Sequence, residues 1–149
     1  MLKLVGVGNR WRGDDGAGLE VAEILAGRAP AGVAVLAHER EPVDLIEAFD
    51  GACAVWLIDA VSSGAPPGTL HRFDASEQAL PAGLFSVSTH RLGLADAVEL
   101  ARALDRLPAR VIVHGIEGAS FEAGGALSPA VASATRALAA TLEAEVAAL

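Results

Sequence analysis

Short apolar runs separate the chain into strand-like segments. Mostly apolar runs at 2–7, 33–36, 52–58 and 110–113 each have the length of a buried strand. A fifth segment, 69–73, is polar and alternating, which is typical of an edge strand. Residues 52–58 form the most hydrophobic segment, as expected of a central parallel strand covered on both faces.

Between these runs, apolar residues recur at helical spacing. The pattern predicts helices over 17–26 and 42–49, a third from Thr89 or His90 to 104, and a fourth that follows Ser128 and continues almost to the end of the chain. Ser128 followed by Pro129 is a typical helix start. Asp14 and Asp15 stand where an N-cap and a first-turn acid would precede the first helix.

Strands and helices therefore alternate along the chain, with no repeat, linker or break in composition. We predict a single α/β domain over residues 1–149. Its architecture would be a three-layer sandwich in which helices flank a mostly parallel, twisted sheet of about five strands. Ligand sites of such sheets lie beyond the carboxyl ends of the strands, and candidate residues are to be sought there.

Composition narrows the possible functions. Hydrophobic residues make up 52% of the chain and charged residues 20%, which excludes a disordered chain. The net charge of −8 leaves no basic face for nucleic acid. No apolar run approaches the length of a membrane span, and the first residues indicate a strand rather than a signal peptide, so we expect a cytoplasmic protein. The one cysteine, Cys53, is expected to be buried in the strand over 52–58.

Several polar residues are expected at the carboxyl edge of the sheet. Asp59 directly follows the most apolar strand, where a carboxylate is desolvated unless it is paired or bound to a cation. Asp15 follows the first strand and His90 opens the third helix. His114 stands at the end of the last strand and Glu117 just beyond it, and structural roles are expected for both. Taken singly, Asp15, Asp59 and His90 each have an ordinary structural explanation. Together, two carboxylates and one imidazole suit a divalent first-row metal such as nickel, zinc or iron.

Sequence motifs of several other enzyme classes are missing from the chain. His38-Glu39 has no second histidine four residues later, and the chain contains neither a Gly-x-Ser-x-Gly elbow nor a P-loop lysine. Gly6-x-Gly8 lacks the third glycine of a dinucleotide fingerprint, because that position is Trp11. No organic cofactor is therefore expected.

The first polar loop contains a motif that resembles the signature of a known protein family. Residues 6–18 read Gly-x-Gly-Asn, four residues, then Asp-Asp-Gly-Ala-Gly, which resembles the N-terminal signature of the hydrogenase maturation endopeptidases. The resemblance continues in family order through Asp59, Ser88-Thr89-His90, Gly115-Ile116-Glu117 and Leu127-Ser128-Pro129. These matches span nearly the whole chain.

The resemblance implies an activity and a site. Members of this family remove a C-terminal extension from the large-subunit precursor of a nickel–iron hydrogenase once nickel is in place. By motif position, Asp15, Asp59 and His90 would be the catalytic and nickel-binding residues, with the nickel presented by the precursor. The chain departs from the family over 38–45, which lacks a Gly-Thr-type turn, and at Gly118, where Pro is frequent. Both departures bear on the choice of hydrogenase.

Several alternatives stay open at this point. The absence of a visible Ser or Cys nucleophile implies attack by water, with the metal either polarising the carbonyl or serving only as a recognition handle while a carboxylate acts as base. A non-catalytic assembly factor would bind the same precursor without cutting it. A nucleotide-binding module would use the loop over 6–18. We expect the chain to act as a monomer.

Overall fold

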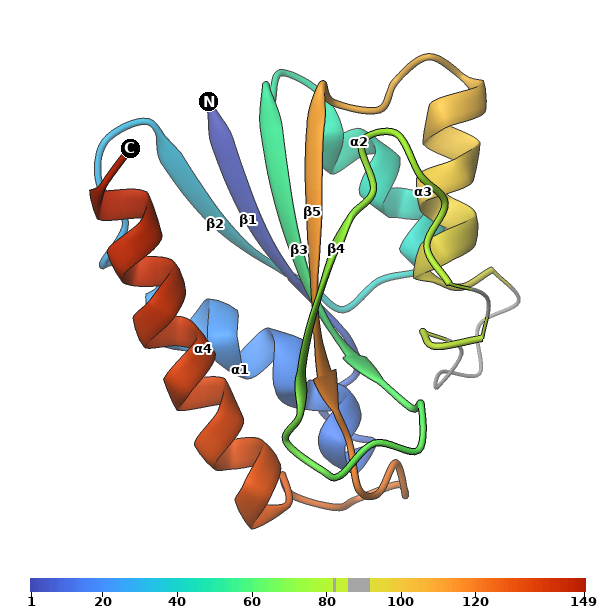
Figure 1. Cartoon of the computed structure of the whole chain (residues 1–149), viewed down its shortest axis with the longest axis vertical. Coiled ribbons are helices and arrows are strands. Elements are labelled where there is room, and N and C mark those ends of the chain that lie inside the picture. The colour runs from blue at the N-terminus through green and yellow to red at the C-terminus, as the bar shows by residue number, and fades with distance from the viewer. Residues whose placement is uncertain (82, 86–91) are drawn as a thin grey trace.

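The fold is seen in a computed structural model that describes residues 1–81, 83–85 and 92–149 (Figure 1). Its sheet has the order β2-β1-β3-β5-β4. The pairs β1–β2, β1–β3 and β3–β5 are parallel, and only the pairing of β4 with β5 is antiparallel. This confirms the predicted α/β sandwich with a mostly parallel sheet, and it confirms that the polar segment near residue 70 is an edge strand.

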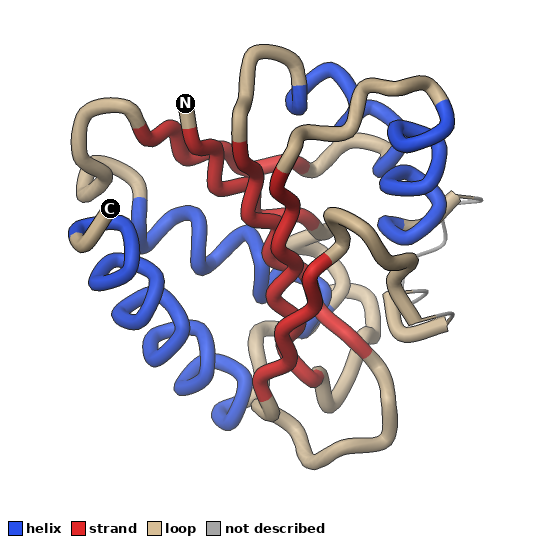
Figure 2. The backbone as a smooth tube through the Cα atoms, turned by 45° about the horizontal axis from the view of Figure 1, so that its top comes forward, coloured by secondary structure: helices blue, strands red, loops and turns tan. Residues whose placement is uncertain are grey.

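The bounds of the elements are as follows. The strands are β1 Leu2–Val7, β2 Val33–His38, β3 Ala54–Val61, β4 Leu70–Asp74 and β5 Arg110–Glu117. The α-helices are α1 Ala17–Leu25, α2 Leu45–Phe49, α3 Leu94–Ala103 and α4 Pro129–Ala147, and two 3-10 turns, η1 Gly13–Gly16 and η2 Pro42–Asp44, precede α1 and α2. Figure 2 shows the helices in blue on both sides of the red strands.

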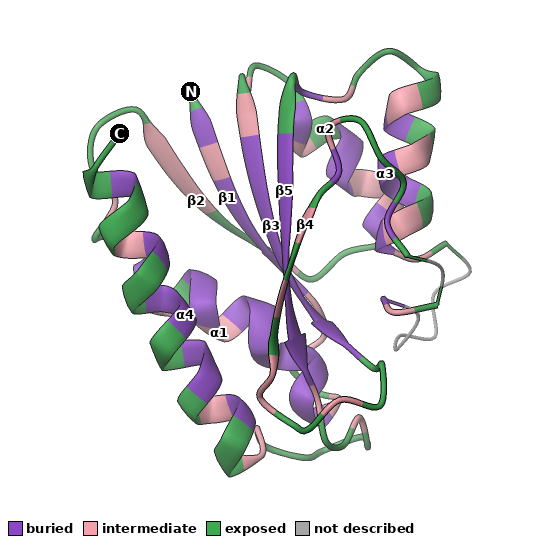
Figure 3. Cartoon of the chain, in the orientation of Figure 1, coloured by how far each residue is buried: buried purple, intermediate pink, exposed green. Residues whose placement is uncertain are grey.

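Each face of the sheet has its own apolar core. Alternate residues of β3 separate the two: Leu57 and Val61 pack with α2 and α3, whereas Trp56 and Ile58 pack with α1 and α4. Such alternation follows from the two-residue period of a strand. The central strands are buried along most of their length (Figure 3), as the continuous apolar runs predicted.

Three strands extend further toward the carboxyl edge than predicted, and the first of them, β2, ends at His38 instead of residue 36. The third strand ends at Val61, so that Asp59 lies inside it and not after it. The last strand continues from Val113 through Glu117, because residues 110–117 pair in register with residues 54–61 of β3. The third strand also begins later than predicted, and Cys53 is exposed just before it, which contradicts the expectation of a buried strand cysteine.

The helices differ from the prediction mainly at their starts. The segment over 42–49 divides into the 3-10 turn η2 and the short helix α2. The third helix begins at Leu94, with Gly93 as its N-cap and the Asp96 carboxylate accepting a hydrogen bond from the Gly93 amide. Leu92, just before this helix, and Leu100, within it, are exposed. The predicted start at Thr89 or His90 lies outside the described residues.

Glycines bring α1 very close to the sheet. A Cβ atom on Gly18 would lie 2.2 Å from the Ile58 carbonyl oxygen, and one on Gly6 would lie 2.1 Å from the Gly18 carbonyl oxygen. Only residues without side chains fit at this crossing, so the first turn of α1 rests directly on β1 and β3. The same contact holds η1, just before α1, against the carboxyl edge of β3. Among the helices of the described ranges, none has the length and apolar content needed to cross a bilayer.

Candidate functional site

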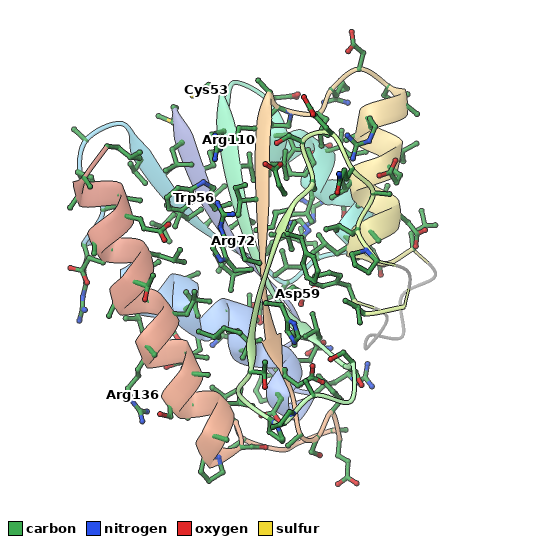
Figure 4. The ribbon with its side chains drawn as sticks, in the orientation of Figure 1. Cys53, Trp56, Asp59, Arg72, Arg110 and Arg136 are labelled. Atoms are coloured by element: carbon green, nitrogen blue, oxygen red, sulfur yellow. The ribbon has the colours of Figure 1, made fainter. Side chains whose placement is uncertain are left out.

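Asp59 is a buried carboxylate near the carboxyl end of the central strand β3 (Figure 4). Alternation places it on the same face as Leu57 and Val61, toward α2 and α3. Its Oδ1 atom accepts a hydrogen bond from the Ala60 amide at 2.8 Å. A carboxylate buried in this way is costly to ionise without a cation or further donors, as the sequence indicated.

The first loop folds back on itself to bring Asp15 to the same edge. Gly8 has φ +152°, and a Cβ atom there would lie 1.9 Å from the Asp15 carbonyl oxygen, which accepts a hydrogen bond from the Asn9 amide at 3.2 Å. The Asn9 side chain also accepts a hydrogen bond from the Trp11 amide at 3.0 Å, a local turn that shapes the loop. Asp15 is 2% exposed, within η1.

The two carboxylates interact electrostatically. The pKa of Asp59 is raised well above its ordinary value, first by burial and next by the negative charge of Asp15. The hydrogen bond from the Ala60 amide opposes this rise. The structure therefore brings together two of the three predicted site residues. His90, the third, lies outside the described residues. Within those residues, no three His, Cys, Asp or Glu side chains are grouped closely enough to hold a metal ion.

Asp14 has a different role from its neighbour. Its fully buried carboxylate accepts hydrogen bonds from the amides of Ala119, Ser120 and Ser128 at 2.7, 3.0 and 2.7 Å, and from the Ser128 hydroxyl at 2.8 Å. Burial opposes ionisation, but these hydrogen bonds outweigh it and hold the pKa of Asp14 below its ordinary value. Asp14 therefore clamps η1 to the segment before α4. The prediction that Asp14 and Asp15 begin the first helix is wrong, because Gly16 is the N-cap of α1.

Glu117 anchors a second polar cluster on the edge of the sheet. It is 2% exposed, its Oε2 accepts a hydrogen bond from the Ser63 amide at 2.8 Å, and its Oε1 accepts one from the Ser63 hydroxyl. The Nε2 atom of His71 lies 3.1 Å from the same Oε1. Sequence reasoning found Glu117 but missed Ser63 and His71. The only signal for His71 was the alternation of the edge strand, which places it on the inner face with Phe73.

His114 faces away from this cluster, toward the core beneath α4. Its ring meets Trp56 edge-on at 6.3 Å between centroids. Burial, with a smaller contribution from the charge of Arg72, lowers the pKa of His114 to about 4. A neutral histidine packed against a tryptophan on this face is part of the core, so the predicted structural role of His114 fits its position.

The sequence is similar to a known family of proteins. Residues 20–145 match the family model described as hydrogenase maturation protease. The chain is 30% identical over 132 residues to the hydrogenase expression/formation protein HupD of Rhodobacter capsulatus, covering 87% of this chain and 63% of that protein. It is also 30% identical over 129 residues to HupM of Azotobacter chroococcum, covering 85% and 62%. The chain thus spans less than two thirds of the length of these curated relatives.

Solved structures share the fold. The hydrogenase maturating endopeptidase HybD from Escherichia coli superposes with a TM-score of 0.79 at 25% identity, covering 95% of this chain and 88% of that one. The endopeptidase HycI from Escherichia coli gives a TM-score of 0.76 at 27% identity, covering 97% and 90%. Because the family model matches most of the chain and these structures share its architecture, the chain belongs to the hydrogenase maturation protease family.

Proposed function

We propose that this protein is an endopeptidase that removes the C-terminal extension of a nickel–iron hydrogenase large-subunit precursor after nickel insertion. It recognises the bound nickel through Asp15, Asp59 and His90, and the reaction takes place in the cytoplasm. The observation that carries the proposal is that Asp15 and Asp59 are both buried at the carboxyl edge of the sheet, close enough for the charge of Asp15 to raise the pKa of Asp59. The names of the similar Escherichia coli structures support peptide-bond cleavage as the activity.

Charge explains why the nickel would act as the signal. Two carboxylates that are buried together repel one another, and a divalent cation offsets both the repulsion and the loss of hydration. A precursor that carries nickel supplies this cation, and the imidazole of His90 completes a mixed oxygen and nitrogen ligand set. A precursor without nickel does not bring this cation to the two carboxylates and binds more weakly for that reason.

Water is the nucleophile in the hydrolytic step. Cys53 is exposed at the beginning of β3, whereas Asp59 lies near the end of this strand, so the thiol is remote from the carboxylates (Figure 4). In this scheme Asp15 and Asp59 hold the metal of the substrate and place the scissile bond beside the site. The base that activates the water is then a group other than the two carboxylates.

The test is cleavage of nickel-loaded and nickel-free precursor, followed by the mass of the large subunit. We expect the wild-type protein to release the extension only from the nickel-loaded form. Asp59→Asn and His90→Ala should each abolish release, whereas Asp50→Asn, an exposed aspartate paired with Arg106, should retain the wild-type rate. Equal cleavage of both precursor forms would rule out nickel recognition.

The same experiment separates the two alternatives. A non-catalytic assembly factor would form a stable complex with nickel-loaded precursor and leave it intact. A nucleotide-binding module would show a rise in melting temperature with nucleotide, and Asp59→Asn would not affect this rise.

A further inference from the structure

Ser63, His71 and Glu117 lie on the same face of the sheet as Asp59. Asp59 is in register with Gly115 of β5, and His71 of β4 is in register with Gly115 from the other side. Asp59, Gly115 and His71 therefore form one row across three strands, which separates the Cα atoms of Asp59 and His71 by about 10 Å. Gly115 contributes no side chain between them.

Glu117 is ionised and fixed in place. Burial alone would raise its pKa, but the hydrogen bonds from Ser63 and the contact with His71 outweigh burial and hold the pKa of Glu117 below its ordinary value. A carboxylate of this kind only accepts hydrogen bonds. The Nε2 atom of His71 must therefore carry the proton in the contact with Glu117.

This contact determines the chemistry of His71. With Nε2 donating to Glu117, Nδ1 is the ring nitrogen that can carry a lone pair, as in other carboxylate–histidine pairs whose carboxylate fixes the tautomer. The His71 side chain is 22% exposed, and its ring stacks on Phe73 at 6.2 Å and 8°. His71 is thus a base of fixed orientation that is partly open to solvent. It lies on β4, two strands away from Asp59 on β3.

The remaining candidates in this cluster are weaker. The Ser63 hydroxyl already donates to Glu117, and the lowered pKa of Glu117 makes it a poor base for activating that hydroxyl as a nucleophile. Asp15 and Asp59 are assigned to the metal of the substrate.

We propose that His71 is the general base of the cleavage reaction and that Glu117 is its positioning residue. This inference rests on the proposed endopeptidase function. Nδ1 of His71 takes a proton from water while the water oxygen bonds to the scissile carbonyl carbon. The carbon–nitrogen bond then breaks, and His71 returns the proton to the departing amine. Ser63 holds Glu117 in place through its amide and its hydroxyl.

The first test is a pair of substitutions that preserve size and polarity. His71→Gln keeps a donor for Glu117 but has no lone pair of comparable basicity, so the rate at saturating nickel-loaded precursor should fall by about 100-fold or more. The half-saturating precursor concentration should stay within about twofold. Arg72→Gln is the matched control, because Arg72 follows on the same strand, is exposed and lies on the opposite face (Figure 4); its rate should stay at the wild-type value.

The second test reads the tautomer directly. In ¹⁵N-labelled protein at neutral pH, the His71 ring should show a protonated Nε2 and an unprotonated Nδ1. Glu117→Gln should remove this preference and lower the saturated rate by about 10- to 100-fold. Both readouts are specific, because a purely structural pin between β4 and β5 would affect the melting temperature and not the balance between turnover and binding.

The outcomes are distinct. Wild-type rates in His71→Gln, or a proton on Nδ1 in the wild-type protein, would overturn the role of His71 and leave the endopeptidase proposal intact. A loss of folding in His71→Gln with normal turnover in the remaining folded fraction would also overturn it. A wild-type protein that cleaves neither precursor form would overturn the endopeptidase proposal and the base together.

Discussion

Asp14 and Asp15 are adjacent in the sequence, yet their carboxylates do unrelated things. Asp14 is saturated with backbone and hydroxyl donors, whereas Asp15 lies close enough to Asp59 to raise its pKa. The sequence placed both acids at the start of the first helix and pointed to Asp15 alone as a site residue. It could not show the role of Asp14, because the donors to Asp14 lie 105 to 114 residues further along the chain.

In the metal-free protein, the buried charge of Asp59 should lower the free energy of unfolding. Asp59→Asn keeps an oxygen that can accept the hydrogen bond from Ala60 and removes the buried charge, so the free energy of unfolding at neutral pH should rise by about 1–3 kcal/mol. The pKa of Asp59 is raised in the folded state, so the carboxylate destabilises the fold as pH rises through that pKa. The advantage of the variant should therefore vanish below about pH 4. Urea unfolding at several pH values measures this, and an equal difference at all pH values would contradict it.

Asp14 should behave in the opposite way. Asp14→Asn places an amide donor among backbone donors, and the free energy of unfolding should fall by about 2–4 kcal/mol at neutral pH. The pKa of Asp14 is lowered in the folded state, so its stabilisation is present above the ordinary aspartate pKa and is lost as pH falls through the folded value. Urea unfolding of Asp14→Asn beside the exposed Asp50→Asn, which should change little, provides the check. Equal stabilities for these two variants would show that the clamp contributes nothing.

At the scale of elements, the glycines of the first loop explain why its signature has such regular spacing. Gly6 and Gly18 meet where α1 crosses the sheet, and Gly8 lies against the backbone of Asp15. The loop is therefore held from both ends, by a strand and by a helix, and Asp15 has little freedom to move away from Asp59. This positioning follows from sterics and not from any charged contact.

Gly18→Ala tests this crossing. An alanine inside a helix ordinarily stabilises it by about 1 kcal/mol relative to glycine, but here the added methyl would overlap the Ile58 carbonyl oxygen. We expect the free energy of unfolding to fall by about 3 kcal/mol, measured by chemical denaturation. The control is Gly125→Ala, whose added methyl would find its nearest neighbours at 3.4 Å and should change stability by no more than about 0.5 kcal/mol. A stable Gly18→Ala variant would mean that the helix can shift without cost.

For the whole molecule, hydrophobic periodicity was enough to predict the layers, the edge strand and the edge of the sheet at which the buried Asp15 and Asp59 lie. The prediction failed where hydrogen bonding to neighbouring strands overrides the local hydrophobic pattern. Residues 114–117 look like the start of a loop, yet β3 on one side and β4 on the other supply backbone partners that extend the strand to Glu117. The contact of His71 with Glu117 depends on this extension, which is why the sequence alone did not single out His71.

The clamp made by Asp14 also bears on the order in which the protein assembles. Its donors at residues 119, 120 and 128 belong to the last fifth of the chain, and β5, which lies between β3 and β4, is translated after both. A ribosome-bound chain that has exposed only its first hundred residues therefore lacks the hydrogen-bond donors that fix η1. It also lacks β5, so β3 and β4 have no strand between them. The proposed active site is therefore completed last, by contacts of high sequence separation that form slowly. A nascent chain would thus carry the first loop without the geometry that makes it a site.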